Sequence, residues 1–292
     1  MNIGFIGLGI MGGAYAKHLL KNKYPCFGIE PDKKNISKFM NLGGVLTTYS
    51  EIFDKVDVII SSLPSLEAYQ NVLENIKKYK TNNKKIIILD MNTISIDDKI
   101  HFQNELQSLK IDVLDTPVSG TGAQADEADL TIFASGKEKL IKQCLPIFDC
   151  FSKEVINVGK FGNGMKFKIL ANLLVTIHNT AAAEALYLGE QAGLEKEMIY
   201  KVLRNSAASS IMLQKRMPLM IDKKYEPPTA SYKIFLKDID IIRSFIKNYD
   251  LTLPTFDGSS KIYDKAEKYL SNNWDTASVY ELIKKEITNE WK

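Results

Sequence analysis

The glycine turn near the amino terminus constrains the fold of this chain more than any other feature. Residues 2–6 predict a short apolar strand, residues 14–20 predict a helix, and between them runs Gly7-Leu8-Gly9-Ile10-Met11-Gly12. In a Gly-x-Gly-x-x-Gly turn the glycines permit a tight turn, a close backbone approach to a pyrophosphate, and close packing of helix on strand. The amides and the positive dipole end of the helix then bind phosphates. Simple strand-to-helix packing produces similar turns, so the pattern needs support from its surroundings.

That support comes from Glu30, which ends a second predicted strand at residues 25–30. An acidic side chain at this place accepts hydrogen bonds from the adenosine ribose hydroxyls of a dinucleotide. A carboxylate also repels a 2′-phosphate, and the next residue is Pro31 rather than an arginine, so we expect NAD. Lys33 or Lys34 leaves NADP open. The predicted cofactor-binding residues of this unit are Gly7, Leu8, Gly9, Ile10, Met11 and Glu30.

Short β-rich runs alternate with helical periodicity over the first half of the chain, which predicts a parallel sheet wound with helices. The runs cover residues 2–6, 25–30, 56–61, 85–89 and 112–114. Two of them, 56–60 and 85–89, are almost continuously apolar, as in strands covered by helices on both faces. We therefore expect an α/β chain whose residues 1–160 form a Rossmann-type doubly wound sheet that binds NAD(P).

The pattern changes after Gly162-Asn163-Gly164. Residues 165–193 contain no proline and are apolar or small around most of the helical circumference, which predicts a long buried helix. The remainder reads as amphipathic helices broken at Pro218, Pro227-Pro228, Pro254 and Asn272-Asn273. Residues 161–292 are thus expected to form an all-α substrate and dimerisation domain, joined to the first by the long helix.

Composition excludes several classes of partner. The 38 basic and 35 acidic residues give a net charge of +3 without a block of like charge, so neither nucleic acid nor an anionic membrane is expected as a partner. Three cysteines have neither metal-ligand spacing nor a disulfide pattern, which predicts no metal site and a reducing cytoplasm. The first residues lack the pattern of a secretion signal, and no apolar run approaches the ~18 residues of a membrane span.

Lys168 and Asn172 are the polar pair expected to carry chemistry. They lie four residues apart near the start of the long helix, so their side chains project from one face. Apolar neighbours desolvate an ammonium group and lower its pKa toward the range of a general acid or base. Lys166 is about 200° around the helix from Lys168 and is expected to be solvated. The pair alone also fits a lysine that snorkels from a buried helix beside an asparagine that fills a packing gap.

Four motifs in order along the whole chain resemble the β-hydroxyacid dehydrogenase family, which includes 3-hydroxyisobutyrate dehydrogenases and tartronate, glyoxylate and succinic semialdehyde reductases. They are residues 5–12, residues 115–120 (Asp-Thr-Pro-Val-Ser-Gly), residues 162–172, and Leu236-Lys237-Asp238-Ile239. The resemblance implies that Lys168 is the catalytic lysine and that Asn172 positions the substrate. It implies that Ser119, Gly120 and Thr121 bind the substrate carboxylate, and that Leu63, Pro64, Thr93 and Lys237 contact the cofactor.

Several residues depart from the pattern of that family. Thr121 and Ala128 replace glycines, Asn92 replaces a common serine, and Ala171 replaces the first of two asparagines. Because Thr121 adds a side chain within the carboxylate-binding segment, the substrate of any one family member does not transfer to this chain. The resemblance implies hydride transfer between a nicotinamide and a small carboxylate-bearing hydroxy acid, or its semialdehyde or 2-oxo acid partner.

Other functions stay open on the sequence alone. Imine reductases share the architecture, although they commonly carry another residue at the position of Lys168. A 6-phosphogluconate dehydrogenase shares the motifs but is normally much longer. A catalytically degenerate scaffold that only binds the cofactor is the non-enzyme alternative. The apolar helix at 165–193 also predicts a homodimer or homotetramer.

Overall fold

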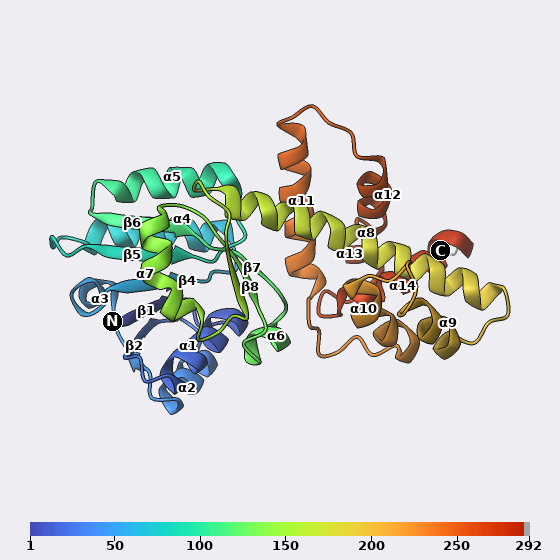
Figure 1. Ribbon diagram of the computed structural model, residues 1–292, viewed down its shortest axis with the longest axis horizontal. Helices are drawn as coiled ribbons and strands as arrows, with labels where there is room; N and C mark the ends of the chain where they lie inside the picture. Colours follow the sequence, from blue (N-terminus) through green and yellow to red (C-terminus); the bar gives the residue numbers. More distant parts are fainter. Residues whose placement is uncertain (289–292) are drawn as a thin grey trace. The chain divides into compact units, whose positions relative to one another are not determined.

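The computed structural model describes residues 1–288, and their contacts form two compact units. The first unit comprises Met1–Lys168 and the second begins at Ile169, so the division falls within one long helix. Figure 1 shows a first unit of strands and helices and a second unit of helices.

A six-stranded parallel sheet forms the centre of the first unit, with the strand order β3-β2-β1-β4-β5-β6. Its strands are β1 (Ile3–Ile6), β2 (Cys26–Ile29), β3 (Val45–Leu46), β4 (Val58–Ser61), β5 (Ile86–Asp90) and β6 (Ile111–Asp115). This order is that of the doubly wound dinucleotide-binding fold, with β1 and β4 side by side at the point where the winding reverses. The predicted Rossmann-type sheet is confirmed.

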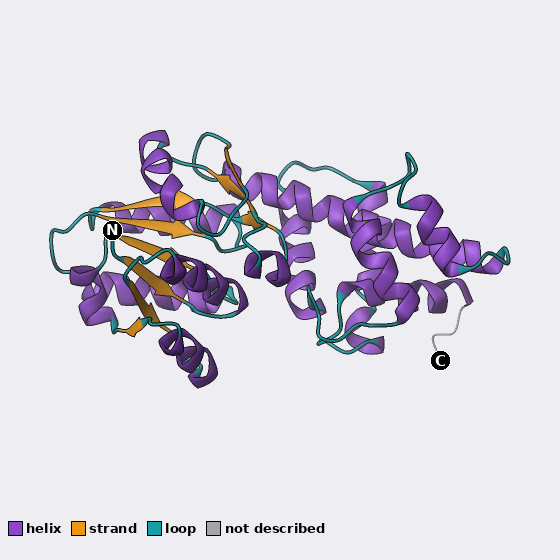
Figure 2. Ribbon diagram, turned by 60° about the horizontal axis from the view of Figure 1, so that its bottom comes forward, coloured by secondary structure: helices purple, strands orange, loops and turns teal. Residues whose placement is uncertain are grey.

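Helices cover both faces of this sheet, as Figure 2 shows. Alternate strand residues enter opposite cores: Val58 and Ile60 pack with Leu19 in one core, and Ile59 packs with Ile76 in the other. The helices that contribute to the first core include α1 (Ile10–Lys21), α2 (Lys33–Asn41) and α7 (Glu138–Phe148). Those of the second core are α3 (Tyr49–Lys55), α4 (Leu66–Tyr79) and α5 (Ile96–Gln107). Burial on both faces explains why these strands are apolar along their whole length.

A smaller sheet follows β6 and was not predicted from the sequence. It comprises β7 (Val118–Ser119), β8 (Thr131–Ala134) and β9 (Glu154–Asn157), and the short helix α6 (Gly122–Asp126) separates its first two strands. β7 pairs with β8 in antiparallel orientation, whereas β8 and β9 are parallel. These strands have two to four residues, too short to show a clear alternation of apolar and polar side chains.

From α8 (Asn163–Gln191) onward, every α- or β-element that the structure describes is helical, in agreement with the predicted all-α domain. The other elements are α9 (Lys196–Leu203), α10 (Ile211–Asp222), α11 (Tyr232–Lys247), α12 (Pro254–Tyr263), α13 (Ala266–Tyr269), the 3₁₀ helix η1 (Thr276–Ser278) and α14 (Val279–Thr288). The predicted helix break at Pro218 is wrong, because α10 runs through this proline with Met217 and Met220 buried beside it.

The helix α8 is the one described helix that is long and apolar enough to cross a membrane by length and composition. The expectation that no segment approaches this limit was therefore too strict. Of the 18-residue window that meets the criterion, 44% is buried within the protein, and a core helix passes the same test. The helix is also less buried than predicted, since Leu170, Leu174 and Leu188 are exposed.

Candidate active site

The glycine turn between β1 and α1 has the geometry of a phosphate-binding turn. Gly7 has a φ of +92°, and a Cβ atom there would lie 2.2 Å from the carbonyl oxygen of Ser62. A Cβ atom on Gly12 would lie 2.2 Å from the carbonyl oxygen of Gly7, so the helix packs directly on the turn. By contrast, a Cβ atom on Gly9 would meet nothing within 4 Å. The turn is thus closed on its protein side and open at Gly9, where a phosphate group approaches the backbone in this fold.

The start of α1 presents its amides without a side-chain cap. Gly9 is the N-cap residue and no side chain bonds to the first turn, while the amide of Gly13 donates to the Gly9 carbonyl oxygen at 2.8 Å. The amides before Gly13, including those of Ile10 and Met11, precede the first bond of the helix and are the ones that bind anions at helix termini. The residues present therefore fit a dinucleotide phosphate.

Glu30 lies directly beside this turn. Its Oε2 accepts a hydrogen bond from the Leu8 amide at 2.5 Å, and its Oε1 accepts one from the Asp32 amide at 3.0 Å. The side chain of Leu8 is buried, so only its backbone faces the turn. The two bonds fix a carboxylate at the end of β2, next to the strand that leads into the glycine turn.

Two further loops lie at the same edge of the sheet, at the carboxyl ends of β4 and β5. The Asn92 Oδ1 accepts a hydrogen bond from the Leu63 amide at 2.6 Å, and the Asn92 Nδ2 donates to the Ser61 Oγ at 3.0 Å. The side chain of Asn92 therefore joins the loop that carries Leu63 and Pro64 to the loop that carries Thr93. Ligands of open α/β sheets bind at this edge, beside the switch between β1 and β4.

The segment after β6 carries the residues predicted to bind the substrate carboxylate. Ser119 ends β7, and Gly120 has a φ of +142°, where a Cβ atom would lie 2.4 Å from the Leu130 Cδ2. Thr121 forms a capping box with Gln124 at the start of α6. The hydroxyl group that distinguishes Thr121 from the usual glycine thus accepts a backbone hydrogen bond of its own helix.

The carboxylate of Asp115 fixes the start of α8, the helix that carries Lys168. Its Oδ2 accepts a hydrogen bond from the Met165 amide at 2.8 Å and one from the Ser135 Oγ at 3.0 Å. The Ser135 Oγ in turn accepts a hydrogen bond from the Gly164 amide at 3.0 Å. Asp115 is also the first residue of the motif that ends at Gly120, so this motif is joined directly to the start of the helix that carries Lys168.

The two lysines near the start of α8 differ in their exposure to water. Lys166 is exposed, whereas Lys168 is half-buried. Asn172 is buried one turn later on the same helix, as expected from the spacing. The structure therefore places the amine that is more shielded from water on the asparagine side of the helix.

Asp238 is a functional candidate that the sequence analysis included in the fourth motif without assigning it a role. In the second unit the Asn172 Nδ2 donates to the Asp238 Oδ2 at 2.9 Å, and the Lys237 Nζ lies 3.4 Å from the Asp238 Oδ1. The carboxylate is buried and fixes the orientation of the Asn172 amide. The signal was the spacing within α11, where Asp238 lies between buried Phe235 and Ile242.

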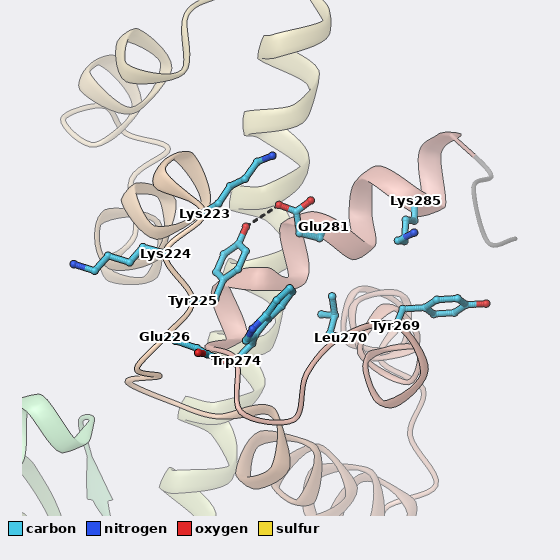
Figure 3. Close-up of a pocket in the computed structure, with 9 residues that line it drawn as sticks. All are labelled: Lys223, Lys224, Tyr225, Glu226, Tyr269, Leu270, Trp274, Glu281 and Lys285. Atoms are coloured by element: carbon cyan, nitrogen blue, oxygen red, sulfur yellow. Dashed lines mark hydrogen bonds between the residues drawn. The ribbon is translucent and has the colours of Figure 1, made fainter.

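A cavity of about 590 Å³ in the second unit involves none of the predicted site residues. Figure 3 shows the ring of Tyr225 beside that of Trp274 at its wall, with the Tyr225 hydroxyl donating to the Glu281 Oε1 at 2.9 Å. Size alone therefore does not identify the active site. Among the described residues, no group of three or more metal-ligating side chains is found either.

Comparison with known proteins finds relatives over the whole length of the chain. Residues 2–159 match the NAD binding domain of 6-phosphogluconate dehydrogenase, and residues 162–283 match the NAD-binding domain of NADP-dependent 3-hydroxyisobutyrate dehydrogenase. The chain is 26% identical to an L-threonate dehydrogenase of Pectobacterium atrosepticum over 96% of this chain and 93% of that protein. It is 32% identical to the mitochondrial 3-hydroxyisobutyrate dehydrogenase of Mus musculus over 70% of this chain and 62% of that protein.

A crystal structure of a 3-hydroxyisobutyrate dehydrogenase from Salmonella typhimurium superimposes with a TM-score of 0.85 at 25% identity, covering 97% of this chain and 99% of that one. The doubly wound sheet, the open glycine turn and the helical second unit define a nicotinamide-dependent oxidoreductase. With both family models matched, the chain belongs to the β-hydroxyacid dehydrogenase family and is an NAD(P)-dependent hydroxyacid dehydrogenase.

Proposed function

We propose that this enzyme transfers hydride between a nicotinamide and a small hydroxy acid or its semialdehyde or 2-oxo acid partner, with Lys168 as general acid and base. The observation that supports this most directly is the hydrogen bond from the Met165 amide to Asp115 at 2.8 Å. It joins the segment with Ser119 and Gly120 to the first turn of the helix with Lys168. The proposed carboxylate-binding segment and the proposed proton donor are thus both connected to Asp115.

Each of these residues has a separate task in the proposed reaction. Ser119, Gly120 and Thr121 bind the substrate carboxylate through a hydroxyl group and successive amides, which suit an anion. The ammonium of Lys168 donates its proton to the oxygen of the carbonyl group as that oxygen becomes an alkoxide. In oxidation the neutral amine accepts the hydroxyl proton. The bound nicotinamide supplies or accepts the hydride.

Asn172 holds substrate and lysine in register, and Asp238 holds the amide of Asn172. Lys237, next to Asp238 in the sequence, closes over the cofactor in this proposal. Gly7, Leu8, Gly9, Ile10 and Met11 bind the phosphates, and Leu63, Pro64 and Thr93 line the nicotinamide ribose. NAD is the preferred cofactor because Glu30, fixed by its bond to the Leu8 amide, repels a 2′-phosphate.

The names of the relatives support a small hydroxy acid as the substrate class. Those proteins are L-threonate and 3-hydroxyisobutyrate dehydrogenases. Both compounds carry one carboxylate, for which residues 119–121 supply the binding segment. Which hydroxy acid this enzyme uses depends on the side chains around that segment, of which Thr121 is one.

The proposal is tested by a turnover panel. The enzyme is incubated with NAD and either L-threonate or 3-hydroxyisobutyrate, and with NADH and either glyoxylate or succinic semialdehyde, and nicotinamide absorbance is followed. Turnover of at least one hydroxy acid or its carbonyl partner is expected. Cofactor binding by thermal shift without turnover over a wide panel would indicate a scaffold, and turnover of cyclic imines alone would indicate an imine reductase.

We further propose a homodimer or homotetramer that packs through the helical unit, in the cytoplasm. Leu170, Leu174 and Leu188 are exposed on α8, and burial of such side chains is worth about 1.5–3 kcal/mol each. None of the three cysteines forms a disulfide, which suits a reducing compartment. Light scattering is expected to give a multiple of the 32.9 kDa chain mass, and a monomer would contradict the proposed assembly.

A further inference from the structure

A buried ionic cluster lies behind the loops of the proposed active site, entirely within the first unit. Lys99, on α5, has a side chain that is 0% exposed, and its Nζ lies 2.8 Å from the Asp115 Oδ1 and 3.3 Å from the Asp90 Oδ1. The same ammonium donates to the Asp90 carbonyl oxygen at 3.3 Å. Asp90 ends β5 and Asp115 ends β6, so one lysine bridges the carboxyl ends of two neighbouring strands.

The first carboxylate of this cluster holds the cofactor side of the site. The Asp90 Oδ1 accepts hydrogen bonds from the Asn92 amide at 3.1 Å and from the Asn92 Nδ2 at 2.7 Å. The Tyr69 hydroxyl donates to the other oxygen of Asp90 at 2.6 Å. The side chain of Asn92, fixed in this way, accepts a hydrogen bond from the Leu63 amide. The loops that carry Leu63 and Thr93 therefore depend on the position of Asp90.

The second carboxylate holds the substrate side. Asp115 accepts a hydrogen bond from the Met165 amide. It also accepts one from the hydroxyl group of Ser135, which in turn accepts a hydrogen bond from the Gly164 amide. These amides belong to the first turn of a 29-residue helix, whose positive dipole end favours a negative charge. Lys168 follows Met165 by three residues, so the position of Asp115 sets the position of the proposed proton donor.

Lys99 keeps the two carboxylates together. Two ionised carboxylates this close in the interior repel each other, and an unpaired buried charge is costly. Burial alone would lower the pKa of the Lys99 ammonium, but Asp115 and Asp90 raise it above its ordinary value, so the group stays charged. Burial and Asp90 raise the pKa of the Tyr69 hydroxyl, which stays a neutral donor.

A buried ion pair is often no more stable than apolar side chains of the same volume, so stability alone does not account for this cluster. Here both carboxylates that bind Lys99 also accept donors from the functional loops: the Asp90 Oδ1 accepts those of Asn92, and the Asp115 Oδ2 accepts the Met165 amide. We propose that Lys99 is a positioning residue, which joins Asp90 to Asp115 and thereby holds the Leu63 loop, the Thr93 loop and the Lys168 helix in one register. Its catalytic consequence rests on the proposed function, but its structural consequence does not.

The test compares three variants with the wild-type protein. Lys99→Met removes the ammonium and leaves two facing carboxylates. The double variant Lys99→Met with Asp90→Asn leaves one buried carboxylate and the same net charge as the native cluster, so it relieves the repulsion without restoring the bridge. Asp90→Asn alone keeps Lys99 paired with Asp115 and controls for the changed acceptor, since an asparagine oxygen still accepts the two bonds from Asn92.

Hydrogen exchange followed by mass spectrometry is the first readout, because it needs neither cofactor nor substrate. In the double variant, peptides that contain the Leu63 and Met165 amides are expected to exchange about tenfold faster or more, while peptides of α12 exchange at the wild-type rate. Asp90→Asn alone is expected to retain wild-type protection at Met165. Wild-type exchange at both amides in a folded double variant overturns the inference. A double variant that does not fold also overturns it, because Lys99 would then be needed for the stability of the core and not for the position of the loops.

Kinetics form the second readout. With a substrate found in the turnover panel, the double variant is expected to lose roughly 10- to 100-fold in kcat, as for a small misplacement of reacting groups, with little change in KM for the substrate. NADH affinity, measured by its fluorescence, is expected to fall with the loss of protection at Leu63. If no substrate is found, the proposed function fails while exchange and NADH binding still decide the role of Lys99. An unchanged kcat in a double variant whose Met165 amide exchanges fast also overturns the proposed positioning role of Lys99.

Discussion

The backbone amide of Leu8 donates a hydrogen bond of 2.5 Å to the carboxylate of Glu30, which ties the glycine turn to the end of β2. Glu30 therefore has two tasks that a single substitution can separate. As an acceptor it binds the Leu8 amide of the turn, and in the proposed function its negative charge discriminates against a 2′-phosphate. Glutamine keeps an acceptor oxygen and removes the charge.

Glu30→Gln is expected to weaken the preference for NAD over NADP by about tenfold, equivalent to about 1.4 kcal/mol. The ratio of kcat/KM for the two cofactors measures this preference in the wild-type and variant enzymes. Glu74→Gln, an exposed change on α4, removes the same charge as a control and should leave the ratio unchanged. A wild-type enzyme that prefers NADP would refute the cofactor assignment.

Ala128 occupies a left-handed backbone conformation with a φ of +57°, just past the end of α6. A Cβ atom is strained there, and helices commonly end with glycine in this conformation. Ala128→Gly is therefore expected to raise the free energy of unfolding by about 0.5–1 kcal/mol. Ala123→Gly, the same chemical change at an exposed position within α6, should lower it by a similar amount. Urea denaturation measures the free energy of unfolding of both variants. A change in the same direction for Ala128→Gly and Ala123→Gly would contradict the strain at Ala128.

Gly164, in the first turn of α8, lies directly against the backbone of β6 and β8 within the first unit. A Cβ atom there would lie 2.5 Å from the Phe133 carbonyl oxygen and 2.8 Å from that of Asp115. Because these neighbours are backbone atoms, Gly164→Ala is expected to destabilise the protein by about 1–3 kcal/mol and to lower kcat. At Gly258, within α12, a Cβ atom meets nothing within 4 Å, so Gly258→Ala should be neutral or stabilising. A neutral Gly164→Ala variant would show that the helix start is not fixed here.

The thiols of Cys26 and Cys144 are expected to be inert in the folded protein. Burial raises the pKa of each to about 12, and Cys150 adds to the shift at Cys26. At pH 8 only about one in 10⁴ of such thiols is ionised, so iodoacetamide is expected to alkylate them only after the protein unfolds. The half-buried Cys150 is expected to react earlier. Mass spectrometry of time points gives the order of reaction. Rapid labelling of Cys144 in the native protein would contradict its burial.

The same shifts fix the sign of a pH effect on stability. An unfolded thiol loses its proton near pH 8.5, while the folded one keeps it until about pH 12. The folded state then binds more protons than the unfolded state, so this contribution to the free energy of unfolding is present below pH 8.5 and is lost as the pH rises above it. A Cys144→Ala variant is expected to show a shallower alkaline loss of stability than the wild type.

The sequence predicted the large sheet because its strands are apolar on both faces and end in recognisable turns. It did not predict β3 or β7 to β9, because their few residues carry no periodic signal. It predicted a helix break at Pro218, but the helix continues through this proline, whose neighbours Met217 and Met220 are buried. Local spacing sufficed to place Lys168 and Asn172 one turn apart on the same helix.

The contacts of Lys99 and Asp238 depend instead on tertiary structure. Lys99 meets Asp115 across 16 positions of sequence, and Asn172 meets Asp238 across 66. No local pattern distinguishes Lys99 from an ordinary lysine on the surface of a helix, and the apolar spacing around Asp238 indicates its buried face but not its partner. The parts of the site that the sequence revealed are therefore those built within one turn or one helix.

The central claim is that Lys168 transfers the proton, and steady-state turnover of Lys168→Ala with the best substrate of the panel tests it most directly. Lys166→Ala, the exposed neighbour, is the matched control, and NADH binding by fluorescence checks that the cofactor site is intact. The account predicts that Lys168→Ala loses about 10²- to 10⁴-fold in kcat with NADH affinity retained, while Lys166→Ala stays near wild type. Near-full turnover by Lys168→Ala would contradict it.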